Sequence, residues 1–347
     1  MADKVVTVIG ARPQFIKAAA VSRAFRHQSN IEEILIHTGQ HFDGAMSDIF
    51  FQELDLPAPK YNLGIAGQSH AAMTGRMMEA IETILIDEKP DICMVYGDTN
   101  STLAGALAAA KLHVPIAHVE AGLRSFNRRM PEEINRVVTD HLAAVQFCPT
   151  QASIENLRRE GISSHVHHTG DVMFDATQFA IAAIADKQDV LKRFGIRAGE
   201  YNICTIHRAE NTDDPARLSA VVDYLRTTTS ELPLVLPLHP RTRSALQKHG
   251  LNMDFAIVTE PLGYFELNML LAGTVMVYTD SGGLQKEAYF HGKPCVTLRD
   301  ETEWVETINH GWNRLWQGAD YVTPRQPITD YGTGNAADKI AQIMADF

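Results

Sequence analysis

The stretch ICMVYGDTNSTLAGALAAAKLHVPIAHVEAG, residues 92–122, decides the fold of this chain. It opens with an apolar, strand-like run at 92–96, continues with an alanine-rich helical pattern at 100–111 and returns to an apolar run at 115–119. A strand, a helix and a second strand in this order predict a right-handed βαβ unit whose parallel strands are neighbours in one sheet. The polar residues that follow each strand are therefore expected at the same edge of that sheet.

The same alternation of short apolar runs and longer helical patterns extends over most of the chain. In the first half, strands are predicted at 5–9, 33–37, 92–96, 115–119 and 145–149, and helices at 13–26, 100–111 and 131–144. In the second half, strands are predicted at 202–206, 233–238, 255–259, 274–278 and 294–298. Pro237 lacks an N–H group, which predicts an edge position or the end of its strand. Regular alternation of this kind indicates α/β domains whose parallel sheets carry helices on both faces.

The length of 347 residues suits two domains. We predict an N-terminal Rossmann-like domain at 1–175, a C-terminal Rossmann-like domain at 176–334 and a C-terminal helix at 335–347, with the domain boundary within 170–190. The amphipathic pattern of the last helix suits packing back on the first domain. Open α/β sheets bind ligands at the carboxyl ends of their strands, so we expect the two sheets to face a central, ligand-binding cleft.

The composition argues against several classes of protein. Acidic residues exceed basic ones, 42 against 31, and this net charge of −11 argues against a protein that binds nucleic acid or a membrane surface. No apolar run approaches the roughly 20 residues of a membrane-spanning helix, and the start MADKVVTVIG leads straight into a strand, without a secretory leader. The four cysteines are far apart, which favours buried reduced thiols. We expect a cytoplasmic protein.

Four acidic residues lie where the catalytic site of such a fold would form. Asp98 follows the first strand of the quoted βαβ unit and Glu120 the second, so we expect their carboxylates within about 10 Å, given a strand spacing of ~4.8 Å. The alternative role for Asp98 is a helix N-cap, whereas Glu120, directly after a buried strand, needs a partner. Glu132 and Glu133 begin a predicted helix, where acids also offset the helix dipole. Both a catalytic and a structural interpretation of this last pair are open.

The second half places a glycine-rich turn between a strand and a helix, in TVMVYTDSGGLQKEA at 274–288. Ser281 and Gly282 let the backbone approach a ligand, and the helix that follows offers N–H groups to a phosphate. Glu287, about one turn further, suits hydrogen bonds from a ribose diol. The alternative is a purely structural turn capped by Asp280 or Ser281.

Basic residues and a histidine follow other predicted strands. In NICTIHRAEN, His207 and Arg208 lie at a strand end, where a histidine can bond a phosphate or assist proton transfer. The alternative is a half-buried structural histidine. In GARPQFIK, Arg12 and Lys17 open the first helix, and they can face an anionic ligand or be solvated.

Several well-known motifs do not occur in this sequence. GARPQF is not the G-x-G-x-x-G motif and there is no P-loop motif, so neither dinucleotide nor P-loop nucleotide binding has its signature. The G-x-S-x-G nucleophile motif is also absent. HVHH at 165–168 has no acidic or cysteine ligand at a usual spacing, so we expect no metal and no cofactor.

Eight segments, in order, resemble the non-hydrolysing UDP-N-acetylglucosamine 2-epimerase family: GARPQFIK, HTGQHFD, YGDTNSTLAGALAA, HVEAGLRS, MPEEINR, TGDVMFDA, IHRAEN and TDSGGLQKEA. The resemblance runs from about Val6 to about Arg314 and is far more specific than any single motif. It implies the GT-B fold, in which two Rossmann-like domains hold a nucleotide sugar in a cleft. That fold agrees with the architecture predicted from the strand pattern.

The resemblance also implies a reaction in two stages. UDP leaves the sugar as the C2 proton is removed, and UDP then adds back to the bound 2-acetamidoglucal while a proton reaches the opposite face. The residues that match the family's catalytic groups are Asp98, Glu120, Glu132 and His207. Those that match its substrate contacts are Arg12, Lys17, Ser281, Gly282 and Glu287. The implied conversion is of UDP-N-acetylglucosamine to UDP-N-acetylmannosamine, a step of polysaccharide biosynthesis.

The sequence departs from commoner members of the family at several positions. Ala11 and Gln14 stand where Thr and Glu are commoner, and Arg128 and Arg129 lie in a loop that is elsewhere more neutral. These features resemble the branch of UDP-2,3-diacetamido-2,3-dideoxyglucuronate 2-epimerases. The extra carboxylate of that substrate would be repelled by a Glu at position 14 but not by Gln14, and either arginine could pair with it. The uronate is therefore the alternative substrate.

Other expectations concern regulation, reaction type and partners. Some members of the family bind a second UDP-sugar as an activator, and the residues that match this site are Gln40, His41, Glu133, Arg208 and His239. A GT-B glycosyltransferase, which needs an acceptor, and a hydrolysing 2-epimerase, which releases free N-acetylmannosamine, are the alternative enzymes. As partners we expect the UDP-sugar and a second copy in a homodimer, with no nucleic acid and no membrane.

Overall fold

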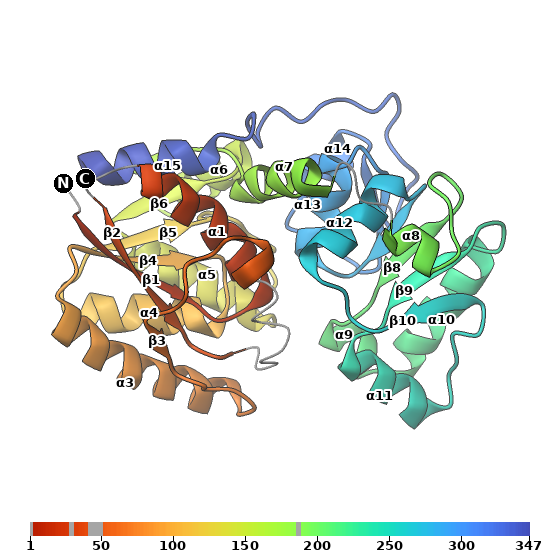
Figure 1. Cartoon of the computed structure of the whole chain (residues 1–347), viewed down its shortest axis with the longest axis horizontal. Coiled ribbons are helices and arrows are strands. Elements are labelled where there is room, and N and C mark those ends of the chain that lie inside the picture. The colour runs from red at the N-terminus through yellow and green to blue at the C-terminus, as the bar shows by residue number, and fades with distance from the viewer. Residues whose placement is uncertain (1–2, 28–30, 41–50, 185–188) are drawn as a thin grey trace. The chain divides into compact units, whose positions relative to one another are not determined.

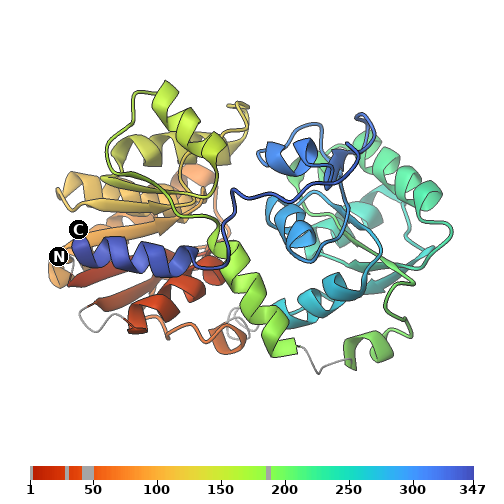
Figure 2. The same cartoon turned by 90° about the horizontal axis from the view of Figure 1, so that it is seen from above.

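The computed structural model describes residues 3–27, 31–40, 51–184 and 189–347 of the chain. The chain forms two compact units, of which the first contains Met1–Ala176 and Thr329–Phe347 and the second contains Thr177–Ile328. The chain thus returns to the first unit at its end, where α15 (Ala336–Asp346) packs against α1 (Arg12–His27), as Figure 1 and Figure 2 show.

A parallel sheet runs through the first unit. Among the described residues it has seven strands, in the order β3-β2-β1-β4-β5-β6-β7. The strands are β1 (Lys4–Ile9), β2 (Glu32–His37), β3 (Tyr61–Asn62), β4 (Ile92–Tyr96), β5 (Ile116–Val119), β6 (Val145–Cys148) and β7 (Val166–His168). All neighbouring pairs are parallel. The order reverses between β1 and β4, and the carboxyl ends of strands at such a switch point are where open α/β sheets bind ligands.

Helices cover both faces of this sheet (Figure 1). They are α1, α3 (His70–Glu88), α4 (Asn100–Lys111), α5 (Pro131–Leu142), α6 (Gln151–Arg159), the start of α7 (Val172–Ile184), and α15. Helix α4 lies especially close to the strands beneath it, because Gly105 has no side chain. A Cβ added there would lie 3.1 Å from Val95 Cγ1 and 3.3 Å from Val8 Cβ. The glycine therefore sets how closely α4 packs on β1 and β4.

The second unit follows the same plan. Among the described residues its sheet has six parallel strands in the order β10-β9-β8-β11-β12-β13. The strands are β8 (Asn202–Thr205), β9 (Leu234–Pro237), β10 (Ala256–Thr259), β11 (Val277–Thr279), β12 (Cys295–Thr297) and β13 (Asn313–Leu315). The helices are the rest of α7, α8 (Asp189–Arg193), α9 (Ala209–Thr212), α10 (Pro215–Thr228), α11 (Pro240–His249), α12 (Tyr264–Gly273), α13 (Gly282–Phe290) and α14 (Val305–Asn309). Val235 and Leu236 belong to different apolar clusters because successive side chains point to opposite faces.

The predicted fold class, two Rossmann-like α/β units with parallel sheets, is confirmed. Pro237 is the last residue of β9, as its missing N–H group predicted. Two short strands differ from the prediction. The run predicted at 274–278 is β11, which begins three residues later because Thr274 still caps α12. Strand β13 was missed, since three residues that include Asn and Arg form no apolar run.

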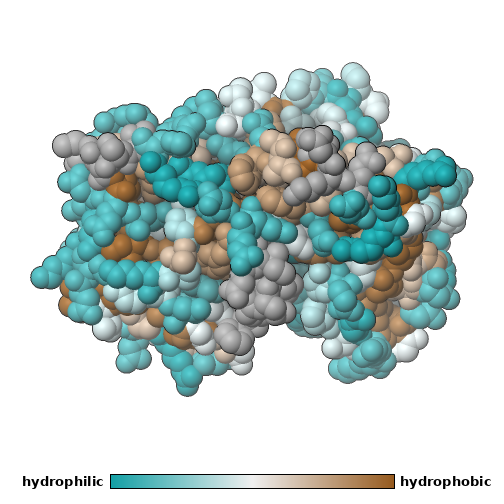
Figure 3. Space-filling model, viewed as in Figure 1, coloured by the Kyte–Doolittle hydropathy of each residue, from teal (hydrophilic) through white to brown (hydrophobic). Residues whose placement is uncertain are grey.

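Polar side chains cover most of the face drawn in Figure 3, with apolar side chains scattered among them. Large apolar residues that are exposed include Ile86, Phe126 and Ile134, and scattered apolar residues are normal on a protein surface. The four cysteines are buried and free, as predicted. In the part of the chain that is described, no helix has both the length and the apolar character needed to span a membrane.

We predict that Gly105→Leu lowers the free energy of unfolding by about 1–3 kcal/mol, the usual cost of overpacking a core. The added side chain would collide with Val8 and Val95 unless α4 moved away from the sheet. The matched control is Gly75→Leu in α3, since a Cβ at Gly75 has nothing within 4 Å. Urea unfolding of both variants measures the difference, and equal stabilities would contradict the prediction.

Candidate functional site

The carboxyl ends of β4 and β5 bring two candidate acids to one edge of the first sheet. Tyr96 and Val119, the last residues of these strands, lie opposite each other in the parallel register. Gly97 N donates a 2.9 Å hydrogen bond to Val119 O. Asp98 and Glu120 therefore leave the sheet at the same edge, beside the switch point between β1 and β4.

Glu120 has an uncommon backbone conformation and a buried lysine as its partner. Its φ angle of 72° lies in the left-handed region, which costs a residue other than glycine on the order of 1–3 kcal/mol. Its carboxylate forms an ion pair with the ammonium of Lys17 from α1, and both side chains are buried. A Cβ added at Gly97 would lie 3.3 Å from Lys17 Nζ and 3.4 Å from Glu120 Oε1. The turn after β4 therefore closes over this pair, and strain of this kind is typical of functional sites.

Asp98 is paired with Arg136, a residue that the sequence analysis did not single out. The carboxylate of Asp98 bonds to Arg136 Nη2 of α5, and Arg136 Nη1 donates to Glu133 Oε2 at 3.0 Å. Asn135 Nδ2 donates to Asp98 O at 2.9 Å, so two consecutive residues of α5 hold the turn that contains Asp98. Helical spacing could have identified Arg136, because it follows Glu132 by four positions and Glu133 by three.

Glu132 and Glu133 have different surroundings at the start of α5. Glu133 is buried, and its carboxylate accepts hydrogen bonds from Ser125 N and Phe126 N, both at 2.9 Å, and from Ser125 Oγ at 3.0 Å. Arg136 is a further donor, so the carboxylate of Glu133 binds several groups of the first unit itself. Glu133 thus has a structural role, and its predicted contact to an activator stays a prediction. Glu132 is half-buried in the same turn and remains a candidate acid.

Gln14 ties the turns after β1 and β4 together. Its Oε1 accepts from Gly10 N at 2.8 Å and from Ala11 N at 3.1 Å. Its Nε2 donates to Tyr96 O at 2.9 Å and to Thr102 Oγ1 at 3.0 Å. The side chain is buried and makes all these bonds within the first unit. Gln14 thus has a structural role, and its predicted place near a uronate stays a prediction.

Thr99, and not Asp98, caps helix α4. The Thr99 side chain accepts a backbone hydrogen bond in the first turn of the helix. Gln40 also serves this helix start, because its Oε1 accepts from Ser101 N at 3.0 Å and from Ser101 Oγ at 2.8 Å. The capping alternative for Asp98 is therefore wrong. Gln40 has a contact within the first unit, and its predicted contact to an activator stays a prediction. His41, predicted beside it, lies outside the described residues.

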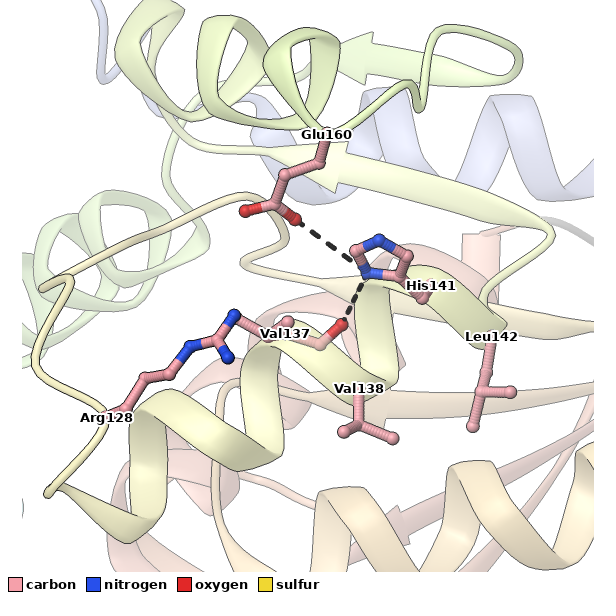
Figure 4. A pocket seen from close by; sticks show the side chains of 6 residues that line it. All are labelled: Arg128, Val137, Val138, His141, Leu142 and Glu160. Atoms are coloured by element: carbon pink, nitrogen blue, oxygen red, sulfur yellow. Dashed lines mark hydrogen bonds and ion pairs between the residues drawn. The ribbon is translucent and has the colours of Figure 1, made fainter.

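Arg128 lines a pocket on a different side of α5. The pocket has a volume of about 450 Å³, and its lining residues are Arg128, Val137, Val138, His141, Leu142 and Glu160 (Figure 4). Successive residues of a helix are about 100° apart. Val137 and Val138 therefore lie on a different side of α5 from Arg136, which contacts Asp98. In this structure Arg128 therefore belongs to the wall of this pocket and not to the hydrogen-bond network of Asp98.

Asp280 organises the candidate histidine of the second unit. It is buried and accepts hydrogen bonds from His207 N, Arg208 N and Asn211 Nδ2, each at 3.0 Å. His207 Nδ1 lies 3.2 Å from Asp280 Oδ1. A buried carboxylate at Nδ1 orients the ring and directs Nε2 away from it, as in many catalytic histidines. The sequence analysis considered Asp280 only as a cap, but the N-cap of α13 is Ser281.

The start of α13 has the properties of a phosphate site. Ser281 Oγ accepts from Leu284 N at 3.5 Å, and the backbone N–H groups of a first helical turn attract anions. A Cβ at Gly282 would lie 2.5 Å from Glu303 Oε1, so a side chain does not fit there. Glu287, on the same helix, is buried. These positions agree with the turn that the sequence pattern predicted.

The remaining candidates lie near the ends of other elements. Arg12 is the first residue of α1 and is half-buried. His239 caps α11 by accepting from Arg241 N at 3.2 Å, and its ring centroid lies 5.9 Å from that of His207. In the described residues, no three His, Cys, Asp or Glu side chains are grouped so that they could hold a metal ion.

Each unit thus has its own chemistry at the carboxyl ends of its strands. In the first unit, Glu120 and Asp98 are carboxylates held beside cations, which is an arrangement that can accept and deliver protons. In the second unit, a glycine-containing helix start and a histidine oriented by Asp280 suit a phosphate group.

Comparisons with known proteins agree with this description over nearly the whole chain. Residues 23–345 match the family described as UDP-N-acetylglucosamine 2-epimerase. A UDP-2,3-diacetamido-2,3-dideoxy-D-glucuronate 2-epimerase of Pseudomonas aeruginosa is 48% identical, over 99% of this chain and 99% of that protein. A UDP-N-acetylglucosamine 2-epimerase of Methanococcus maripaludis is 44% identical, over 98% of each. The crystal structure of Methanocaldococcus jannaschii UDP-GlcNAc 2-epimerase in complex with UDP-GlcNAc and UDP has 38% identity and a TM-score of 0.91, and covers 99% of this chain and 100% of that one.

We predict that removing one partner of the buried Lys17–Glu120 pair destabilises the protein more than removing both. Lys17→Met leaves a buried carboxylate without its cation, which should cost about 3–5 kcal/mol of unfolding free energy. Lys17→Met/Glu120→Gln removes both charges and should recover most of that loss. Urea unfolding of the single and double variants measures the coupling.

The control for this prediction is an exposed ion pair. Arg158 and Glu155 lie 2.7 Å apart on the surface of α6, and Arg158→Met should change the unfolding free energy by less than about 1 kcal/mol. Equal losses in the single and double Lys17 variants would show that the pair does not act as a unit.

Proposed function

Since this chain belongs to the UDP-N-acetylglucosamine 2-epimerase family, we propose that it interconverts UDP-N-acetylglucosamine and UDP-N-acetylmannosamine. The activity of the family, inversion of a UDP-sugar at C2, is that of an isomerase. The observation that carries the proposal is the gathering of acids at the switch point of the first sheet, with Glu120 in a strained turn beside Lys17.

The proposed reaction is an elimination followed by an addition. The C2 hydrogen of this sugar is not acidified by a carbonyl group, so its removal has to accompany departure of UDP. The product of this step is 2-acetamidoglucal, and UDP adds back as a proton reaches the opposite face of C2. Positive charge develops on the sugar as UDP leaves, and nearby carboxylates stabilise it. Two faces require at least two acid or base groups.

We assign the proton transfers to the acids of the first unit. Lys17 forms an ion pair with Glu120 and Arg136 with Asp98, and carboxylates are common general bases. Glu132 is the third candidate, because it lies in α5, the helix whose Arg136 pairs with Asp98. The backbone strain at Glu120 favours it as one of the two groups that act at C2.

We assign UDP binding mainly to the second unit. The first turn of α13, with Ser281 and Gly282, would bind the diphosphate through backbone N–H groups. Glu287 would accept hydrogen bonds from the ribose diol. His207, oriented by Asp280, would hold or protonate the departing diphosphate. Arg12 of the first unit would contribute a further positive charge to the leaving group.

We predict that the product acquires one solvent deuterium at C2 when UDP-N-acetylglucosamine is incubated with the enzyme in heavy water. Proton NMR follows the loss of the C2 signal, and UDP with 2-acetamidoglucal should accumulate on prolonged incubation. Glu120→Gln should slow the exchange by about 100-fold or more, the usual scale of acid–base assistance. Glu155→Gln, on the exposed side of α6, is the matched control and should leave the rate unchanged.

Three other outcomes would contradict the proposal. Retention of the original C2 hydrogen through turnover would exclude elimination and addition. Free N-acetylmannosamine together with UDP would identify the hydrolysing alternative, and transfer of the sugar to an added acceptor would identify a glycosyltransferase.

The expected homodimer is tested separately by light scattering on the purified protein.

A second candidate substrate is UDP-2,3-diacetamido-2,3-dideoxyglucuronate, favoured by the 48% identity to an enzyme named for it. The uronate carries an additional carboxylate that needs a cation. Lys17 and Arg136 beside the candidate acids already have acidic partners. Arg128 and Arg129 are both exposed in the loop before α5. Arg128 lines the pocket on the other side of α5, so Arg129 is the better candidate of the two.

We predict that kcat/KM is at least as high for UDP-N-acetylglucosamine as for the uronate, and that Arg129→Ala changes both values alike. Arg128→Ala is the matched control, because Arg128 lines the pocket on the other side of α5. A kcat/KM that favours the uronate at least tenfold in the native enzyme, and that falls selectively in Arg129→Ala, would make the uronate the substrate. Steady-state kinetics of the three proteins with both sugars decide between them.

A further inference from the structure

His118 lies where the turns of the candidate acids meet α5, and none of the roles above uses it. It belongs to β5, and its side chain has an exposed fraction of 0%. Its Nε2 lies 2.7 Å from Gly97 O, and its Nδ1 lies 2.7 Å from Asp140 Oδ1. Gly97 directly precedes Asp98, and His118 precedes Glu120 by two positions. The buried ring therefore contacts the turn of Asp98 and α5, and the strand that carries it leads into the turn of Glu120.

Both ring nitrogens of His118 face groups that accept hydrogen bonds. A carbonyl oxygen can only accept, so Nε2 donates to Gly97. Asp140 also accepts from Arg124 Nη1 at 2.7 Å and from Gly122 N at 3.1 Å. Burial raises the pKa of Asp140, but His118 and Arg124 outweigh it and hold that pKa below its ordinary value. The buried ion pair with Arg124 keeps the Asp140 carboxylate ionised, whatever the charge of His118. Nδ1 must then donate as well, and an imidazole ring that donates through both nitrogens carries a positive charge.

The charge on this ring is balanced within the first unit. Arg124 contacts Asp140 on one side and Glu160 on the other, through bonds of 2.8 Å and 2.7 Å to the two oxygens of Glu160. The row His118, Asp140, Arg124, Glu160 therefore alternates in sign, with its first three members buried and Glu160 at the surface. A row of this kind is rigid, because displacing any member leaves its neighbour as an unpaired buried charge.

This row holds the backbone on both sides of Glu120. His118 lies two positions before Glu120, and the bond from Gly122 N to Asp140 lies two positions after it. Backbone strain such as the φ of 72° at Glu120 persists only where the surroundings over-determine the conformation. The Nε2 bond to Gly97 O connects the same row to the turn of Asp98.

We propose that His118 is a positioning residue that acts as an imidazolium, fixing the turns of Asp98 and Glu120 relative to each other. The proposal rests on the proposed function, because the spacing of two acids matters if both act at C2. Its neutral form could not donate to Gly97 and Asp140 at once, so the charge is part of the role. A misplacement of about 1 Å in such a site costs on the order of 100-fold in rate.

The first test is kinetic. His118→Gln should lower kcat for C2 inversion by about 100-fold while KM for the UDP-sugar stays within about threefold, because the proposed UDP contacts lie in the second unit. Release of 2-acetamidoglucal per turnover should rise, since misplaced acids impair re-addition. His141→Gln, an exposed histidine on α5, is the matched control and should leave kcat, KM and release unchanged. An unchanged kcat in His118→Gln, or a loss explained by the unfolded fraction alone, would overturn the proposal.

The second test needs no variant. In the native protein labelled with ¹⁵N-histidine, both ring nitrogens of His118 should show protonated chemical shifts and slowly exchanging hydrogens at neutral pH. A His118 ring with one unprotonated nitrogen would overturn the proposal, even if His118→Gln failed to fold. This result does not depend on the reaction, whereas failure of the proposed function would appear as absent C2 exchange in the native enzyme.

Discussion

Burial of charge is the constraint on which the first unit depends. An ionised side chain removed from water costs several kcal/mol unless an opposite charge accompanies it. The acids at the ends of β4 and β5 meet this requirement through cations from other elements, Lys17 from α1 and Arg136 from α5. Arg124 does the same for Asp140. Because each pair joins two elements, the electrostatic requirement also sets where α1 and α5 lie on the edge of the sheet.

The buried ion pairs of the first unit favour reactivity over stability. A well-packed apolar cluster is often at least as stable as buried ion pairs of the same volume, and the left-handed φ of Glu120 adds strain. Such features are expected where local rules give way to function. In the second unit, the buried carboxylate of Asp280 is stabilised mainly by hydrogen bonds. They come from backbone N–H groups and Asn211, and the ring of His207 lies beside it. Its anion site depends on helix geometry and hydrogen bonds, and a buried ion pair also lies beside it, because Glu303 next to Gly282 pairs with Arg299 at 3.0 Å.

Reaction type and sugar specificity depend on different kinds of residue. The groups proposed to act at C2 have positions fixed by the core and by their ion-pair partners. A contact specific for a uronate would come from an exposed residue such as Arg129, whose position packing does not fix. Two relatives named for different sugars are 48% and 44% identical to this chain. Overall similarity therefore identifies the reaction class and does not distinguish between the two sugars.

The sequence by itself determined the α/β class, the parallel strands and the edge at which Asp98 and Glu120 emerge, because apolar periodicity and the handedness of βαβ units are local rules. It did not determine which polar residues the fold itself uses. Glu132 and Glu133 are neighbours of identical chemistry, and only the packing of α5 against the loop before it separates them. Lys17 and Glu120 lie 103 positions apart, so no local pattern could pair them. Which distant side chains share a buried volume, and must therefore neutralise one another, is decided by tertiary packing.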